Sequence, residues 1–188
     1  MTAQQTAVNS VLRGVVKPFL AFTSFHPDKL HKRRPLVCGA ASLLPVPATS
    51  GSTGFPQASS GPRVDALNND PTANDRVLLY LHGGGYLACS PITHRNITMR
   101  LARYAGCRVL AINYRKAPHY PYPYALEDSP AGSRVAAGSG TSADRIMLAG
   151  DSAGGHLTLA TLLAIRDRPA SARSGCLFVT LDRFVLQR

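Results

Sequence analysis

The sequence predicts an α/β fold in which helices cover both faces of a mostly parallel sheet. From about residue 76 onward, short apolar segments alternate with longer amphipathic ones, which is the pattern of repeated strand–helix–strand units. The short segments are apolar almost throughout, as expected for strands buried on both faces. Such units are joined by right-handed crossovers, so consecutive strands are expected to run parallel.

The length of 188 residues suits one domain with a core of its own. Residues 1–34 are predicted to form a helical, cap-like segment, residues 35–75 a loop with edge strands, and residues 76–188 the α/β core. In the first segment, apolar residues recur at helical spacing until Pro18, which would end or kink the helix. This apolar stripe could cover a hydrophobic site or dock on a membrane surface, but packing on the core is the default expectation.

The segment before the regular pattern is rich in Pro, Gly, Ser and Thr. Residues 36–44 and 63–67 could form the short edge strands of a hairpin, whereas residues 45–62 are expected to be a loop. An Asn-Asn-Asp-Pro turn at 68–71 then precedes the first buried strand.

Buried strands are predicted at residues 77–81, 109–112 and 146–149, and a fourth could follow at 176–181. Each is a short run of mainly Val, Leu, Ile and Ala residues. Because the segments between them are long enough for a helix, parallel pairing is favoured over hairpins.

Three helices are predicted after these strands. The first starts at Ser90-Pro91, with Ser as N-cap and Pro at the first helical position, and it ends at Gly106. Its expected apolar face consists of Ile92, Ile97, Leu101, Ala102 and Ala105. The second helix is predicted over 124–137, after a proline-rich loop, and the third over 153–166.

A Gly-x-Ser-x-Gly motif occupies the turn between the third strand and the third helix. A sharp turn there would force Ser152 outward, and Gly150 and Gly154 would let strand and helix pass closely. The helix start offers unpaired N–H groups and the positive end of the helix dipole beside the hydroxyl. This suits a nucleophile whose reaction develops an oxyanion, although the motif alone is also compatible with an ordinary strand–turn–helix.

A second motif, His-Gly-Gly-Gly-Tyr at 82–86, follows the first buried strand directly. Three glycines permit backbone conformations closed to other residues and let a ligand oxygen approach bare N–H groups. In an acyl-transfer enzyme such donors form an oxyanion hole, and losing one typically costs about 3 kcal/mol of transition-state stabilisation. Glycine-rich loops also bind phosphate, but neither of the usual nucleotide-binding patterns is present.

The two motifs, in this order and about seventy residues apart, resemble those of the hormone-sensitive-lipase-like group of α/β-hydrolases. The Tyr-Arg-Lys-Ala-Pro segment at 114–118 and the segment 121–128 also resemble that family, and the resemblance covers about residues 76–167. It implies a partial α/β-hydrolase fold and a serine carboxylic-ester hydrolase, acting on small-molecule, short-acyl esters through an acyl-enzyme. It implies no cofactor and no metal.

By this resemblance Ser152 is the nucleophile, and the N–H groups of Gly83, Gly84 and Ala153 receive the oxyanion. Supporting roles are implied for His82, Gly85, Tyr86 and Asp151.

Three other residues, two histidines and one acid, are not expected to complete a triad. His82 is expected to shape the glycine loop rather than act as a base, and Asp151 to be a turn residue rather than the triad acid. His156, one helical turn after Ser152, is not expected to reach back as the base.

The family's triad acid and base follow the nucleophile in chain order. No histidine follows His156, and Asp167 and Asp182 come too early to be the acid. We therefore expect a C-terminally truncated chain that lacks the last strands and hydrolyses esters at near-background rates, because a serine hydroxyl without a base is a poor nucleophile. The uncovered sheet edge would leave it marginally stable or prone to aggregation.

Two smaller departures from the family pattern remove carboxylates. Asn113 stands where an acid is usual, and His119 where the family usually has Glu. Both changes are expected to weaken a local ion-pair network.

The net charge of +11 could indicate a nucleic-acid or membrane partner. However, the basic residues are scattered apart from a cluster at 29–34, and the chain has a single Glu, Glu127. Nucleic-acid binding is therefore not expected. No apolar run approaches the roughly 20 residues of a membrane span. The N-terminus lacks a clear secretory signal, which favours the cytoplasm, with a transit peptide as the weaker alternative.

The four cysteines are too widely spaced for a zinc site or a disulfide framework and are expected to be reduced (Cys38, Cys89, Cys107 and Cys176). Two other hypotheses stay open beside the esterase: a non-catalytic ligand-binding protein on the same scaffold, and a non-functional fragment. A homodimer of a full-length protein also stays open.

Overall fold

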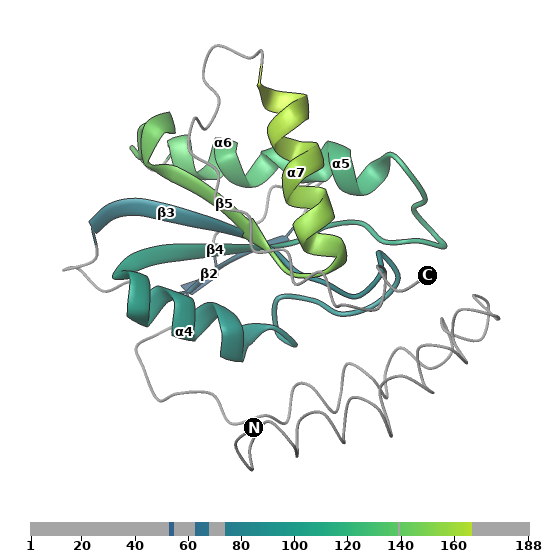
Figure 1. Ribbon diagram of the computed structural model, residues 1–188, viewed down its shortest axis with the longest axis horizontal. Helices are drawn as coiled ribbons and strands as arrows, with labels where there is room; N and C mark the ends of the chain where they lie inside the picture. Colours follow the sequence, from purple (N-terminus) through teal and green to yellow (C-terminus); the bar gives the residue numbers. More distant parts are fainter. Residues whose placement is uncertain (1–52, 55–62, 68–73, 139, 167–188) are drawn as a thin grey trace, which may run out of the picture. The chain divides into compact units, whose positions relative to one another are not determined.

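A 5-stranded sheet in the order β1-β2-β4-β3-β5 forms the centre of the computed structural model, which describes residues 53–54, 63–67, 74–138 and 140–166 (Figure 1). The central strand β3 (Asn74–Leu81) runs parallel to β4 (Cys107–Asn113) and to β5 (Ile146–Gly150). Strand β2 (Arg63–Leu67) is antiparallel to β4, and β1 (Thr53–Gly54) is antiparallel to β2. The predicted mostly parallel sheet is confirmed.

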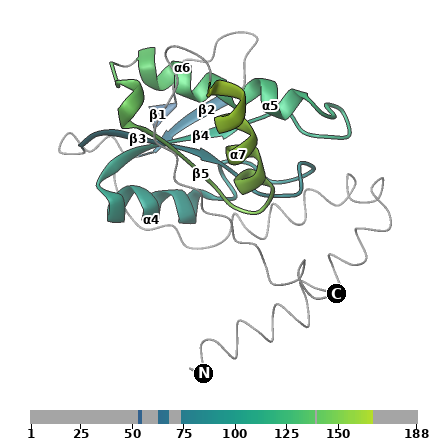
Figure 2. The same ribbon diagram turned by 45° about the horizontal axis from the view of Figure 1, so that its top comes forward.

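The helices cover both faces of this sheet, as predicted (Figures 1 and 2). Helix α4 (Arg95–Ala105) lies on one face. Helices α5 (Tyr124–Asp128), α6 (Pro130–Gly138) and α7 (Ala153–Ile165) lie on the other. A 3-10 turn, η2 (Ala143–Arg145), leads into β5.

Side chains of the parallel strands alternate between two buried layers, because successive residues of a strand point to opposite faces. The larger layer lies under α5, α6 and α7 and includes Val77, Leu79, Leu81, Ile112 and Leu148. The second layer packs against α4 and includes Leu78, Tyr80, Ala102, Val109 and Ala149. The expectation that these strands are buried on both faces is therefore confirmed.

The strand predicted at 63–67 has its expected limits, but the expectation that it is an edge strand is wrong, because β2 lies between β1 and β4. Strand β1 lies inside the segment 45–62 that was expected to be a loop, so that expectation is wrong for Thr53–Gly54. Two residues carry no alternating pattern, and they form a strand only because β2 offers them an edge. The predicted helix in 1–34 and the strands predicted at 36–44 and 176–181 lie outside the described residues.

The predicted start of the first helix is wrong, since α4 begins at Arg95 and not at Ser90-Pro91. The Ser90 N–H donates to Thr93 Oγ1 at 3.0 Å, and that hydroxyl donates to the Ser90 carbonyl at 2.8 Å. These bonds close a separate turn that competes with helix initiation. The helix does end at Gly106, whose φ of 56° is the left-handed conformation expected there.

The later start also changes which residues of this segment are buried. Thr98 and Ala102 are buried on α4, whereas Ile92 and Ile97 are 62% and 44% exposed, contrary to the predicted apolar face. The predicted helix over 124–137 is likewise interrupted at Ser129, because proline lacks an N–H and is best accommodated at a helix start. Thr161 Oγ1 of α7 donates to Ser129 Oγ at 2.6 Å, which holds the break against α7.

Candidate active site

Ser152 lies at the tip of the turn between β5 and α7, with its side chain exposed. Its φ of 49° and ψ of −119° are rarely adopted by a residue with a Cβ, so the backbone is strained. The turn is closed by the Gly154 N–H, which donates to the Asp151 carbonyl at 2.7 Å. This matches the outward-facing serine that the motif predicted.

The glycines on either side of the turn lie where two backbones nearly touch. A Cβ at Gly150 would collide with the carbonyl of Gly154, and a Cβ at Gly154 would collide with the carbonyl of Leu81. The predicted close passage of strand and helix is therefore present, and β3 contributes to it as well as β5.

The first N–H donor of the glycine loop, that of Gly83, already has a hydrogen-bond acceptor. In this structure the Gly83 N–H donates to Asp151 Oδ1 at 2.9 Å. Gly84 and Gly85 have φ values of 117° and 62°, which favour glycine strongly. Their N–H groups meet no hydrogen-bond acceptor among the described residues.

Asp151 is more than a turn residue, because its carboxylate joins the nucleophile turn to the glycine loop. Besides the Gly83 N–H, it accepts the Tyr80 hydroxyl at 2.7 Å and lies 3.3 Å from His94 Nε2. Burial alone would raise the pKa of Asp151, but the hydrogen bonds from His94, Tyr80 and Gly83 outweigh it and lower the pKa below its usual range. The carboxylate is thus held ionised.

Lowering the pH is expected to remove the stability that Asp151 provides. A carboxyl whose pKa is lower in the folded than in the unfolded chain stabilises the fold fully above the unfolded value of 3.8 and loses that contribution as the pH falls through the folded value. D151N cannot ionise, so its free energy of unfolding should be lower by about 1–2 kcal/mol at pH 6, and the gap should shrink below about pH 4. Urea unfolding of both proteins between pH 3 and 6 measures this, and a gap that does not narrow contradicts it.

His82 is buried under the glycine loop, as expected for a residue that shapes it. Its Nδ1 lies 2.7 Å from the Gly83 carbonyl, and its ring stacks on Tyr114 with centroids 4.4 Å apart. Burial lowers the pKa of His82 to about 3, so the ring is neutral at pH 7. The Tyr114 hydroxyl donates to the His82 carbonyl at 2.6 Å, which holds the end of β3 in place.

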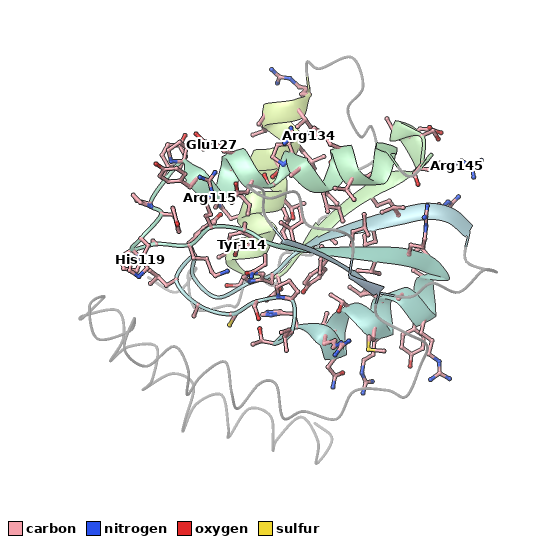
Figure 3. The ribbon with its side chains drawn as sticks, turned by 180° about the vertical axis from the view of Figure 1, so that it is seen from behind. Tyr114, Arg115, His119, Glu127, Arg134 and Arg145 are labelled. Carbon is pink, nitrogen blue, oxygen red and sulfur yellow. The ribbon has the colours of Figure 1, made fainter. Side chains whose placement is uncertain are left out.

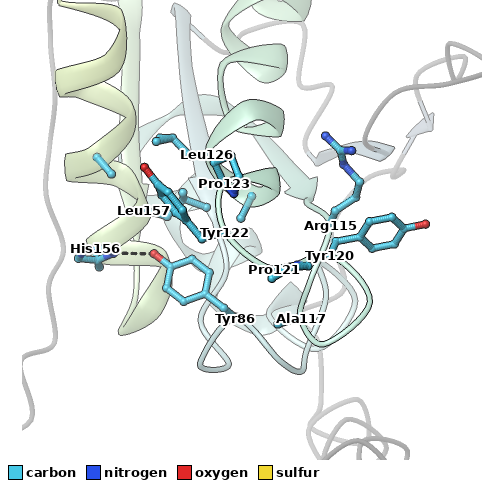
Figure 4. A pocket seen from close by; sticks show the side chains of 12 residues that line it. Tyr86, Arg115, Ala117, Tyr120, Pro121, Tyr122, Pro123, Leu126, His156 and Leu157 are labelled. Carbon is cyan, nitrogen blue, oxygen red and sulfur yellow. Dashed lines mark hydrogen bonds between the residues drawn. The ribbon is translucent and has the colours of Figure 1, made fainter.

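Tyr86 and His156 meet above the start of α7. The Tyr86 hydroxyl lies 2.6 Å from His156 Nδ1, and the two rings are perpendicular (Figure 4). In the described part of the chain the His156 side chain makes no hydrogen bond to the Ser152 hydroxyl, and the expectation that His156 is not the base stays a prediction.

An apolar pocket of about 220 Å³ opens beside this pair, between the proline-rich loop, α5 and α7 (Figure 4). Its walls are mostly aromatic and aliphatic and include Tyr86, Tyr122, Pro123, Leu126 and Leu157. Ser152 itself does not line this pocket.

Arg115, which follows β4, forms ion pairs with two acids of α5, and the picture places it beside one of them, Glu127 (Figure 3). Arg115 Nη2 lies 2.7 Å from Asp128 Oδ1 and 3.3 Å from Glu127 Oε2. The Asn113 side chain accepts a hydrogen bond from Lys116 Nζ at 2.6 Å, so the amide still supplies an acceptor where an acid was expected. Whether the two departures from the family pattern weaken this network stays a prediction.

Within residues 53–166 as far as they are described, no three His, Cys, Asp or Glu side chains come together as a metal site. Neither Cys89 nor Cys107 is in a disulfide there, and burial raises the pKa of the Cys107 thiol. Over the same part of the chain, no helix is long and apolar enough to cross a bilayer.

Comparison with known families gives a match over residues 78–181, more than half of the chain, to the family described as the α/β-hydrolase fold. The chain belongs to the α/β-hydrolase family. This hydrolase chain is 45% identical to an acetyl-hydrolase of Streptomyces hygroscopicus over 104 residues, which are 54% of this chain and 35% of the relative. It is 34% identical to the esterase LipU of Mycobacterium tuberculosis over 161 residues, which are 83% and 54% of the two chains.

Among solved structures, a crystal structure of an esterase from the bacterial hormone-sensitive lipase family superposes with a TM-score of 0.64 and 37% identity. The match covers 73% of this α/β-hydrolase chain and 46% of that esterase. The resemblance inferred from the two motifs is thereby confirmed. This chain spans about half or less of the length of the relatives it matches.

Proposed function

We propose that Ser152 is the nucleophile of a carboxylic-ester hydrolase, in which an acyl-enzyme forms on the serine and is then hydrolysed by water. The observation that carries this proposal is the strained, exposed Ser152 at the start of α7, joined through Asp151 to a loop of glycines. Donors held in place beside a serine are the arrangement that acyl transfer requires, since negative charge develops on the substrate oxygen.

The oxyanion hole that this geometry supports differs by one residue from the sequence-based assignment. Gly84 stays in it and Gly85 takes the place of Gly83, because the N–H groups of Gly84 and Gly85 meet no acceptor among the described residues whereas that of Gly83 is held by Asp151. Ala153 supplies a third N–H, since the first residues of a helix have no intrahelical acceptor.

The substrates we propose are small-molecule esters with a short acyl group. The pocket beside Tyr86 is apolar and, at about 220 Å³, smaller than most sites for drug-sized ligands. The names of two relatives, an acetyl-hydrolase and an esterase, agree with this class. A cytoplasmic location, the lack of a nucleic-acid partner and a homodimer of a full-length protein stay predictions.

Complete turnover also needs a general base for the serine. Of the described histidines near the turn, His82 is bound to Gly83, His94 to Asp151 and His156 to Tyr86. We therefore propose slow chemistry for the 188-residue chain. The same observation favours a second candidate, a protein on this scaffold that binds esters without hydrolysing them.

A fluorophosphonate probe and mass spectrometry test the role of Ser152. Because an oxyanion hole without a base can still give about 10³-fold acceleration over water, we expect slow formation of a single covalent adduct. S152A should abolish the adduct, whereas S142A, at an exposed serine before β5, should leave it unchanged. An adduct that survives S152A would exclude Ser152 as the labelled nucleophile, whereas the absence of any adduct in the parent protein would favour the ester-binding protein.

A further inference from the structure

His94 stands at a position of α4 where other residue types would stabilise the helix more. It is the N-cap of α4, yet its side chain makes no capping hydrogen bond. Ser, Thr, Asp and Asn stabilise this position by about 1 kcal/mol relative to non-capping residues. The first turn of α4 also contains no acid that would compensate. The imidazole therefore makes its contacts outside its own helix.

The imidazole instead bridges the turn before α4 and the nucleophile turn. Its Nε2 lies 3.3 Å from Asp151 Oδ2, and its Nδ1 lies 2.9 Å from Thr93 Oγ1 and 3.3 Å from the Ser90 carbonyl. An ionised carboxylate can only accept, so the bridging proton is on Nε2. The His94 side chain is 12% exposed, and the His82 ring packs 5.6 Å away.

The two oxygens of Asp151 have different tasks. Oδ1 accepts from Tyr80 and from the Gly83 N–H, whereas Oδ2 meets His94. Without His94 the carboxylate could rotate, and the bond that holds the glycine loop to the turn would lose its alignment. The strained backbone of Ser152, the next residue, persists only if its surroundings hold it on several sides.

We propose that His94 is a positioning residue for the nucleophile: by holding Asp151 Oδ2 it fixes the glycine loop against the turn that carries Ser152. This rests on the proposed role of Ser152 as the nucleophile. His94 does not touch the reacting atoms and acts only through Asp151.

Two substitutions separate this role from a local structural one. In H94Q the side-chain amide nitrogen can occupy the place of Nε2 and still donate to Asp151, whereas in H94N it occupies the place of Nδ1 and meets only Thr93 and Ser90. We expect the second-order rate of fluorophosphonate labelling at Ser152 to fall on the order of tenfold in H94N and to stay within about threefold in H94Q. Urea unfolding of the two variants verifies that both are folded under the labelling conditions, so that a loss of reactivity is not a loss of the fold.

The opposite order, with H94N reactive and H94Q not, would show that His94 serves only its own turn and would overturn the proposal. Equal losses in both variants would overturn it as well. H94N introduced into D151N should slow labelling no further than D151N alone, because both changes remove the same contact. Effects that multiply would mean that His94 does not act through Asp151.

Amide NMR of the same proteins tests the positioning role of His94 independently of the chemistry at Ser152. In H94N the Gly83 amide proton should exchange faster with solvent and its chemical shift should change. In H94Q both its exchange rate and its chemical shift should be nearly unchanged. An unlabelled parent protein would count against Ser152 as the nucleophile, while the Gly83 amide would still decide the role of His94. A Gly83 amide that is unaffected in H94N would overturn the proposal.

Discussion

Replacing Gly154 by alanine is expected to prevent the nucleophile turn from closing and to destabilise the fold by about 3 kcal/mol or more. A Cβ at this position would overlap the carbonyl oxygen of Leu81 and lie 2.7 Å from the carbonyl carbon of His82. These are backbone atoms at the end of β3, where Leu81 is paired with Gly150 of β5. Neither strand can move away without breaking the parallel ladder, so the new methyl group cannot be accommodated.

Gly138 provides the matched control for this substitution. It lies at the end of α6, exposed, and a Cβ there would meet no atom within 4 Å. G138A should be neutral or more stable by up to about 1 kcal/mol, because alanine reduces the entropy of the unfolded chain. Urea unfolding followed by circular dichroism compares the two variants with the parent protein. Equal stability of G154A and G138A would show that strand and helix do not pass as closely as the structure has them.

The sequence predicted the nucleophile turn well because the residues that form it are consecutive. Gly150, Ser152 and Gly154 lie within five consecutive residues, between a strand and a helix that their own apolar patterns reveal. The limits of the strand at 63–67 also follow from its local pattern, but its pairing with β4 does not. The missed break at Ser129-Pro130 was also local, since a proline inside a predicted helix is itself evidence of an interruption.

The contacts that hold the turn in place could not be predicted in the same way. His94 and Asp151 are far apart in the chain, and their meeting depends on how α4 docks beside β3. Tyr80 did give a local signal, because a tyrosine in an otherwise aliphatic strand needs a partner for its hydroxyl. Which of three successive glycines faces the serine depends on the bond from Gly83 to Asp151, and no spacing in the motif encodes that choice.

Removing the carboxyl group of Asp128 is expected to be the other strongly destabilising change, with D128A costing about 2–3 kcal/mol of unfolding free energy. Asp128 is 5% exposed and accepts hydrogen bonds from the backbone N–H, Nε and Nη2 of Arg115 at 2.7–3.0 Å. Alanine would leave these donors without the acceptor that now satisfies them. The Arg115 guanidinium also stacks 4.4 Å from the Tyr124 ring centroid, so its displacement would loosen the start of α5.

The neighbouring acid, Glu127, provides a control for D128A because it contacts the same arginine. Glu127 lies 3.3 Å from Arg115 Nη2, but its side chain is 56% exposed. An exposed pair of this kind is worth little, because water screens it and two flexible side chains must be ordered to form it. E127A should therefore cost less than about 0.5 kcal/mol in the same urea titration. Similar losses in E127A and D128A would mean that charge near Arg115, rather than the buried hydrogen bonds of Asp128, holds α5 against the strand that precedes it.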